Sequence, residues 1–170
     1  MILSELIAGA LGPVLDLFPQ IHARPASNEY GVKDSIWSKP KLFRGPLLHI
    51  PALTHVEVYP DHDITVDLGL QTLDTLDGKS VALNATAIVY INDPLLLREI
   101  AGDEWMEYIA QRLRGVLTGV VADLKFSKVP QDAGEFVEVY SEKIMDTYGC
   151  EIVAVVLEDC TEVIPVRLFS

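Results

Sequence analysis

Histidines and aspartates clustered between residues 49 and 63 come closest to a metal-binding set in this chain. The cluster consists of His49, His55, Asp61, His62 and Asp63. Its spacing matches no known ligand pattern, since structural zinc sites use short, regular intervals between ligands. Histidine at a strand end and aspartate at a turn are both common as solvated surface. We therefore predict no metal site and no cofactor.

The serines and paired carboxylates form no catalytic arrangement in the sequence. A nucleophile needs a base within hydrogen-bond reach and a third group that orients the base. No serine lies in a Gly-x-Ser-x-Gly elbow, and no glycine-rich phosphate loop is present. Asp103-Glu104 and Glu158-Asp159 are pairs expected by chance in an acidic chain, and the first suits a helix N-terminus. We predict that the chain is not an enzyme.

Cationic and aromatic side chains alternate between residues 37 and 44. They are Trp37, Lys39, Lys41, Phe43 and Arg44. One interpretation is a solvated loop with one buried aromatic ring. The other is a membrane-surface contact, in which aromatic rings lie at headgroup depth and each nearby cation contributes about 1 kcal/mol toward anionic lipid. The position of this group, between an apolar N-terminus and the rest of the chain, favours the second interpretation.

Residues 1–18 form an apolar N-terminal segment, followed by a linker at residues 19–28. The segment is shorter than the roughly 20 apolar residues of a membrane-spanning helix, and Pro13 should kink or end a helix there. Three alternatives stay open: an interfacial or re-entrant membrane anchor, a segment docked on a neighbouring subunit, or a helix on the domain's own core. The absence of Lys and Arg weighs against an interfacial helix. Its candidate contact residues are Leu3, Leu6, Ile7, Leu11, Val14, Leu15 and Phe18.

The charge is acidic and unevenly distributed. The formal net charge is −12, yet residues 1–60 hold five acidic and five basic side chains, so the net negative charge lies in residues 61–170. Such a balance argues against nucleic acid as a partner, because phosphate binding needs a basic face. An anionic membrane would be approached by the neutral N-terminal part. Cys150 and Cys160 fit neither a disulfide framework nor a metal site, and we expect both to be buried.

The elements that position these residues centre on a long β-hairpin that turns at Asp77-Gly78. Residues 64–73 should place Ile64, Val66, Leu68 and Leu70 on one face. In the return strand, residues 80–91, the buried face should consist of Val81, Leu83, Ala85, Ala87, Val89 and Ile91. Before the hairpin we expect a strand around residues 29–37, a turn-rich stretch at 38–46 and a strand at 54–59.

Helices and a closing strand are predicted after the hairpin. Asp93 should cap a first helix with Pro94 at its first position. A second helix, residues 103–125, should bury Met106, Ile109, Leu113, Val116 or Leu117, Val120 and Leu124. A third, residues 131–148, should bury Ala133, Phe136, Tyr140, Ile144 and Tyr148, with Gly149 after its end. Strands are expected at residues 150–158 and 162–169.

Four local sequences, in order along residues 29 to about 160, resemble motifs of the SPFH (Band 7) family, which includes stomatin, prohibitin, flotillin and bacterial relatives. Gly45-Pro46-Leu47-Leu48-His49-Ile50-Pro51 resembles the family's entry motif, with the order of Gly and Pro exchanged. Residues 73–81 resemble its hairpin turn, and residues 87–94 resemble its strand end before Asp-Pro. Tyr148-Gly149-Cys150-Glu151-Ile152 resembles its junction before the closing strand. Each motif is weak alone, but their joint order and spacing are specific.

The resemblance implies an α+β SPFH-like domain over residues 29–170, in which two to three helices pack on an antiparallel β-ribbon sheet with a closing C-terminal strand. It also implies a non-enzymatic scaffold on the cytoplasmic side of a membrane. Such a scaffold forms a homo-oligomeric ring or cage and organises membrane or regulates membrane-bound partners such as proteases. The alternative is a soluble oligomeric binding module whose N-terminal segment docks on a neighbouring subunit or partner. Family members usually continue into a coiled coil, and this chain is expected to be a short member without one.

Overall fold

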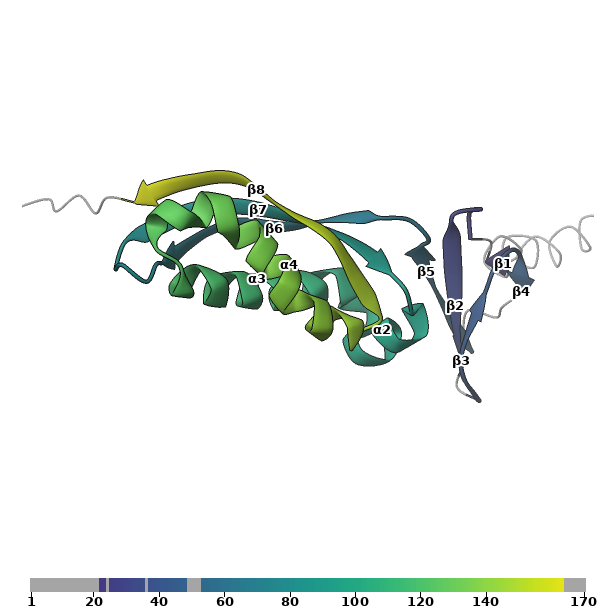
Figure 1. Ribbon diagram of the computed structural model, residues 1–170. Helices are drawn as coiled ribbons and strands as arrows, with labels where there is room; N and C mark the ends of the chain where they lie inside the picture. Colours follow the sequence, from purple (N-terminus) through teal and green to yellow (C-terminus); the bar gives the residue numbers. More distant parts are fainter. Residues whose placement is uncertain (1–21, 24, 36, 49–52, 164–170) are drawn as a thin grey trace, which may run out of the picture. The chain divides into compact units, whose positions relative to one another are not determined.

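The computed structural model of the chain describes residues 22–23, 25–35, 37–48 and 53–163 (Figure 1). The chain divides into two compact units, Met1–Asp61 and His62–Ser170. Each unit has its own antiparallel sheet, and each is described by itself. Residues 1–18, four of the ten residues of the expected linker (19–21 and 24) and the end of the chain after Val163 lie outside the described residues.

The first unit is built on a three-stranded sheet in the order β3-β2-β5. Strand β2 (Glu29–Ser35) pairs with both β3 (Ser38–Phe43) and β5 (Thr54–Pro60), and the short strands β1 (His22–Ala23) and β4 (Leu47–Leu48) pair with each other. The prediction of a turn-rich stretch at 38–46 is wrong for residues 38–43, which form β3. Proline is tolerated there because β3 is an edge strand, where the missing N–H faces away from the ladder.

The second unit has a three-stranded sheet in the order β6-β7-β8. Strands β6 (Ile64–Asp74) and β7 (Ser80–Ile91) form the predicted hairpin, and β8 (Cys150–Val163) pairs along the other side of β7. Because β7 is central, one of its faces is buried along its whole length, as predicted; the buried residues are Val81, Leu83, Ala85, Ala87, Val89 and Ile91.

A bulge in β6 changes which side chains face the core. The register shifts between Asp67 and Gly69, where Gly69 adopts a φ of 69° and donates its N–H to the Asp67 carboxylate at 2.7 Å. An extra residue in one strand reverses the alternation beyond it. Val66 and Leu68 are buried as expected, whereas Leu70 is 75% exposed. The prediction that Leu70 shares their face is therefore wrong.

Strand β8 is a single strand of 14 residues, where two strands at 150–158 and 162–169 were expected. Its pairing with β7 continues from Cys150 opposite Ile91 to Val163 opposite Ser80, with register shifts at Asn84/Ala85 and Ile88/Val89. The expected break at 159–161 is absent from the described residues because Cys160 and Thr161 keep partners on β7.

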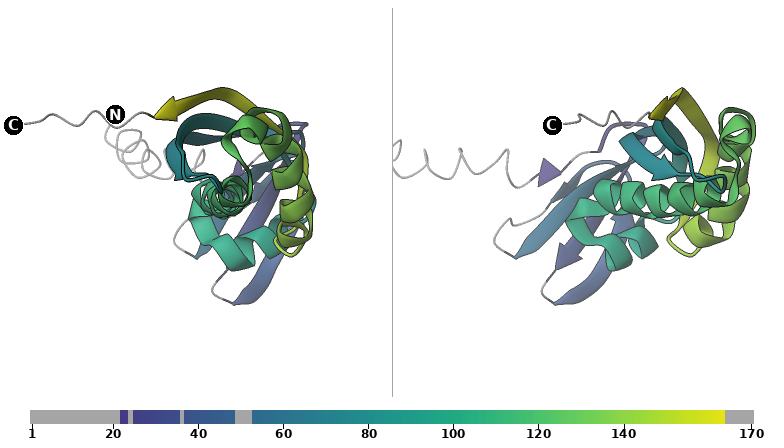
Figure 2. Two further views of the ribbon diagram at one scale, coloured as in Figure 1. Left: turned by 60° about the vertical axis from the view of Figure 1, so that its left-hand side comes forward. Right: turned by 90° about the vertical axis from the view of Figure 1, so that its left-hand side faces the viewer.

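The helices of the second unit lie on the same side of its sheet (Figure 1 and Figure 2). Helix α2 (Pro94–Ala101) begins as predicted, with the Asp93 carboxylate accepting hydrogen bonds from the N–H groups of Leu95 and Leu96. Helix α3 (Trp105–Asp123) packs on β6, and α4 (Val129–Asp146) packs on β8 and α3. Short 3₁₀ turns precede α3 (η1, Gly102–Glu104) and α4 (η2, Phe126–Lys128).

The buried stripes of both long helices differ from those predicted. In α3, Trp105 is buried and Met106 is exposed, although Ile109, Leu113, Leu117 and Val120 are buried as expected. In α4, Ala133 is buried as predicted, together with Val129, Val137, Ser141 and Met145, whereas Phe136, Tyr140 and Ile144 are exposed. This prediction chose the aromatic stripe, one position away from the stripe that is buried.

Helix α4 has small residues, such as Ala133 and Gly134, on its buried side because it approaches the backbone of β8 closely. A Cβ atom at Gly134 would lie 3.0 Å from the Val155 carbonyl oxygen, closer than a side chain tolerates without adjustment. Nearby, the Glu138 carboxylate accepts a hydrogen bond from the Val155 N–H at 2.7 Å. Aromatic rings do not fit between a helix and a strand packed this closely, so they lie on the outer side.

Candidate functional site

The tip of the β2–β3 hairpin presents exposed aromatic and cationic side chains. Trp37 lies in the turn and is 73% exposed, and Lys39, Lys41 and Leu42 on β3 are also exposed. The pairing of β3 with β2 shifts register between Ser38 and Lys41, so alternation along the strand does not place Lys39 and Lys41 on one face. Sequence analysis selected three of these residues, Trp37, Lys39 and Lys41, as candidates for contact. We refer to Trp37, Lys39, Lys41 and Leu42 as the hairpin tip.

Two further candidates, Phe43 and Arg44, make contacts inside the first unit. The ring of Phe43 covers Gly31, where an added Cβ would come within 2.2 Å of the ring. The Arg44 guanidinium lies 4.1 Å from the centre of the Tyr30 ring and donates a hydrogen bond to the Asp61 carboxylate at 2.6 Å. The structure therefore separates this group into an exposed tip and a base that holds β3 in place.

Helix α4 carries a second exposed surface, and three of its four residues, Phe136, Tyr140 and Ile144, were predicted to be buried. Phe136, Val139, Tyr140 and Ile144 are all exposed, with Val139 and Tyr140 at 60% and 63%. The Phe136 and Tyr140 rings contact each other with their centroids 6.3 Å apart. We call these four residues the α4 patch. Its exposed aromatic and aliphatic side chains are typical of interaction surfaces.

Acidic side chains surround the α4 patch. Helix α4 contains Asp132, Glu135, Glu138, Glu142 and Asp146, against the single cation Lys143. Near its C-terminal end, a pocket of about 430 Å³ is lined by Asn92, Val139, Glu142, Lys143, Asp146, Cys150 and Glu151. Its three carboxylates outnumber the single ammonium group of Lys143, so the lining keeps a net negative charge that suits a cationic side chain with an apolar stem.

The comparison with protein families identifies the fold as a known one. The model of the SPFH domain / Band 7 family matches residues 26–162. The chain belongs to the SPFH domain / Band 7 family. No curated protein sequence matches the chain at a significant level. The match covers β2 to β8 and thus most of both units, which confirms the resemblance found in the sequence and the expected α+β class.

Members of the SPFH/Band 7 family are in general associated with membranes, act as scaffolds and are not enzymes. The predicted contact residues of segment 1–18 lie outside the described part of this SPFH protein, so their role stays a prediction. They are Leu3, Leu6, Ile7, Leu11, Val14, Leu15 and Phe18. In residues 22–23, 25–35, 37–48 and 53–163, no helix combines the length and the apolar character needed to cross a bilayer.

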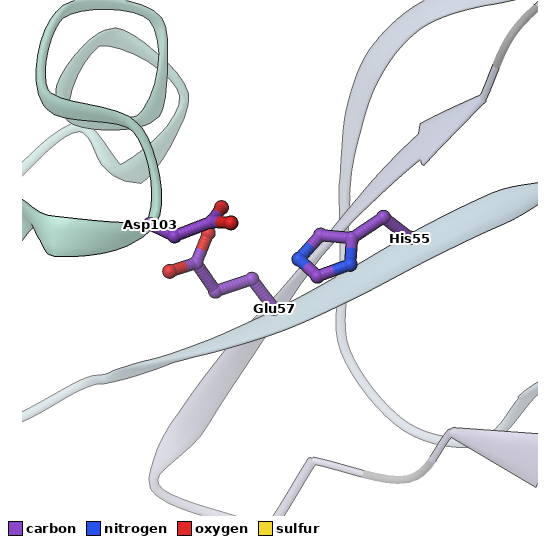
Figure 3. A group of neighbouring side chains, drawn as sticks. All are labelled: His55, Glu57 and Asp103. Carbon is purple, nitrogen blue, oxygen red and sulfur yellow. The ribbon is translucent and has the colours of Figure 1, made fainter.

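Three side chains of this SPFH protein have ligand atoms of the kinds that bind metals, namely His55, Glu57 and Asp103 (Figure 3). His55 and Glu57 lie two residues apart on β5, and Glu57 accepts a hydrogen bond from the Tyr59 hydroxyl at 2.9 Å. Asp103 belongs to the second unit, in η1, and Arg98 donates a hydrogen bond to it. Because Asp103 belongs to a different unit from His55 and Glu57, we do not propose a metal site from these three residues. Of the histidine cluster considered above, His49 lies outside the described residues and Asp61 pairs with Arg44.

The two cysteines differ in burial, although the sequence predicted burial for both. Cys150 is buried, and this burial raises the pKa of its thiol to about 12. Cys160 on β8 is half-buried, and burial raises the pKa of its thiol as well. A thiol that stays protonated at neutral pH is a poor nucleophile, so Cys150 has the character of a packing residue.

The α4 patch is the surface that sequence reasoning missed. Phe136, Val139, Tyr140 and Ile144 recur at helical spacing, and such a stripe normally predicts a buried face. A weaker signal pointed to the true face: the small residues Ala133, Gly134 and Ser141 mark the side on which a helix can approach a backbone closely.

Proposed function

We propose that this chain is a membrane-associated scaffold that assembles with copies of itself on the cytoplasmic side of a membrane. In that position it organises the membrane or regulates membrane-bound partners, such as proteases. The observation that carries the proposal is the SPFH/Band 7 match over residues 26–162, with the apolar segment 1–18 seven residues before it. Membrane contact is assigned to that segment, and the hairpin tip is a separate surface for contact with a protein partner.

The distribution of charge supports this orientation. Residues 61–170 carry the net charge of −12, whereas residues 1–60 are balanced. An anionic membrane surface repels the acidic second unit and tolerates the neutral first one. The scaffold would therefore approach the membrane through its N-terminal unit.

Flotation with vesicles of phosphatidylcholine and phosphatidylserine tests membrane association. Full-length protein should float with the vesicles at low salt, and the double variant Leu6→Asp/Leu15→Asp should stay at the bottom of the gradient. The variant Leu70→Asp is the matched control because it adds aspartate at a leucine that is already exposed on the second unit. Wild-type protein that does not float at low salt would contradict membrane association.

A soluble oligomeric module is the second candidate function. The α4 patch favours it, because an exposed apolar surface with an acidic border needs a protein partner and not a lipid. The two acidic residues of segment 1–18, Glu5 and Asp16, favour it as well, since a membrane-surface helix usually carries cations. In that case the particle mass without lipid should be large and should fall in Leu6→Asp/Leu15→Asp, and no variant should float with vesicles.

A further inference from the structure

The α4 patch requires a partner that is both apolar and basic. Its centre consists of Phe136, Val139, Tyr140 and Ile144, and all of them are exposed. Helix α4 is acidic, and three carboxylates line the pocket at its C-terminal end against the single cation Lys143. An anionic lipid surface would be repelled by these carboxylates. A protein segment that combines an aromatic anchor with cations satisfies both parts of the surface.

This chain contains one long stretch with that chemistry. Residues 35–56 include no aspartate or glutamate, and they include Lys39, Lys41 and Arg44. Arg44 is already engaged by Asp61 within the first unit. The side chains left to meet a partner are those of the hairpin tip, in which Trp37 and Leu42 are apolar and Lys39 and Lys41 are cationic.

We infer that the hairpin tip of one copy docks on the α4 patch of a second copy. Trp37 contacts the aromatic centre at Phe136 and Tyr140, and the two lysines reach the carboxylates at and beside the pocket. The inference rests on the proposed self-assembly and names the contact that produces it. It assigns the exposed hairpin tip to a neighbouring subunit and leaves membrane contact to residues 1–18.

The charges of the two surfaces are complementary. The hairpin tip carries the cations Lys39 and Lys41, and no carboxylate occurs between residues 35 and 56. On α4, Glu142 and Asp146 are four residues apart and therefore lie on the same side of the helix. Each lysine can thus meet a carboxylate of α4.

The contact joins two different surfaces, and each copy carries both of them. Such a head-to-tail contact is repeated from copy to copy, and it produces a closed ring or an open chain of subunits. A symmetric contact between two α4 patches would instead bring two acidic borders together, which is unfavourable. The charge of α4 therefore selects the hairpin tip over a second α4.

Cysteine cross-linking between two variants tests the contact directly. One variant carries Ser38→Cys and the other carries Val139→Cys, so that Trp37 and Tyr140 stay in place. Both also carry Cys160→Ser, whereas the unreactive Cys150 is retained. After mixing and mild oxidation, the disulfide between the two variants should form at least about tenfold more than the disulfide within either variant alone. Gln111→Cys, exposed on α3, replaces Val139→Cys as the control and should give no enrichment.

Charge exchange provides an independent measurement on assembled particles. Lys39→Glu/Lys41→Glu and Glu142→Lys/Asp146→Lys should each raise the protein concentration needed for assembly by about tenfold or more, measured by mass photometry. The combination of both pairs in one chain should restore assembly. Failure of the combination to restore it, together with absent cross-linking, would overturn the inference.

The remaining outcomes separate the contact from the proposed function. If wild-type protein assembles and floats with vesicles but Ser38→Cys and Val139→Cys do not cross-link, the contact is wrong and the scaffold function stands. If Lys39→Glu/Lys41→Glu loses flotation and keeps its particle mass, the hairpin tip is a membrane contact and the inference is wrong. Wild-type protein that stays monomeric with and without vesicles contradicts both the contact and self-assembly.

Discussion

The two β-hairpins of this chain end in turns that are held very differently. The turn between β6 and β7 is attached to the rest of its unit: the Asp77 carboxylate accepts a hydrogen bond from the Phe126 N–H at 3.0 Å, and the Leu76 N–H donates to the Leu124 carbonyl at 2.9 Å. The turn between β2 and β3 exposes Trp37, Lys39 and Lys41. The first turn is bonded to the segment that precedes α4, and the second presents its side chains to solvent.

The difference lies in where the polar side chains of each turn are used. In the β6–β7 turn, Thr75 is buried, its hydroxyl lies 2.7 Å from the Asp77 carboxylate, and it accepts a hydrogen bond from the Lys79 N–H at 3.2 Å. Lys79 in turn pairs with Glu162 of β8 at 3.0 Å. The polar groups of this hairpin turn thus stabilise the second unit, whereas those of the β2–β3 tip are exposed to solvent. Substitutions should therefore affect stability at one turn and association at the other.

The largest effect on stability is expected for Thr75→Val. The substitution keeps the shape of a buried side chain and removes the hydroxyl that bonds within the turn, which should lower the free energy of unfolding by about 1 to 3 kcal/mol. Urea denaturation followed by circular dichroism measures the loss. Thr72→Val, at an exposed position of β6, is the matched control and should change stability little. Equal losses in both variants would show that the turn is not the anchor described here.

A smaller loss is expected for Gly78→Ala. Gly78 adopts a φ of 74°, a left-handed conformation that costs an alanine about 1 to 2 kcal/mol, although no atom lies within 4 Å of the added Cβ. Gly115→Ala, in the middle of α3 with equally open surroundings, should instead stabilise the protein by up to about 1 kcal/mol. Opposite shifts of the thermal midpoint would confirm the prediction, and shifts of the same sign would contradict it.

The anchoring of the β6–β7 turn should weaken in acid. The hydrogen bond from Thr75, and then that from the Phe126 N–H, lower the pKa of Asp77 below its ordinary value. A lowered pKa in the folded state means that the contribution to stability is present above the ordinary pKa of about 4 and is lost as the pH falls through the folded value. The difference in urea midpoint between wild type and Asp77→Asn should therefore narrow below about pH 4. A difference for Asp77→Asn that stays constant across this pH range would contradict the prediction.

The smallest effect on stability is expected at the hairpin tip. Trp37→Ala removes an exposed side chain and should change the free energy of unfolding by less than about 0.5 kcal/mol. Val32→Ala, at a buried position of the neighbouring strand β2, should lower the urea midpoint clearly. A destabilisation by Trp37→Ala as large as that by Val32→Ala would mean that the tip is part of the core and not a contact surface.

Much of the fold could be predicted because several elements are determined locally. Buried and partly exposed side chains alternate along the whole of β7. Such a pattern is typical of a strand in an antiparallel sheet with one face packed on the core. The Asp93 cap and Pro94 depend only on adjacent backbone groups, so their place at the start of α2 follows from the sequence. The Asp77-Gly78 turn follows for the same reason, since glycine adopts positive φ at low cost.

The misassigned residues have two kinds of cause, one local and one distant in sequence. The bulge at Asp67 to Gly69 exposes Leu70, and its local sign was a glycine inside a strand. The buried stripe of α4 is decided by how close β8 approaches at Val155, which favours Gly134 over the aromatic residues. Pro40 indicated a turn because proline is rare in strands, but an edge strand accepts it. For the candidate site, the sequence singled out Trp37, Lys39 and Lys41, whereas the α4 patch emerges only from the packing of α4 on β8.

The division of the chain at Asp61-His62 has a consequence for the size of any assembly. The hairpin tip belongs to the unit before this junction, and the α4 patch belongs to the unit after it. If copies join head to tail, the rotation that relates one copy to the next depends on the angle between the two units at this junction. The junction would thus determine curvature and, through it, the number of copies in a closed ring. Particles with a range of diameters would reflect variation at this one point in the chain, with every contact between copies unchanged.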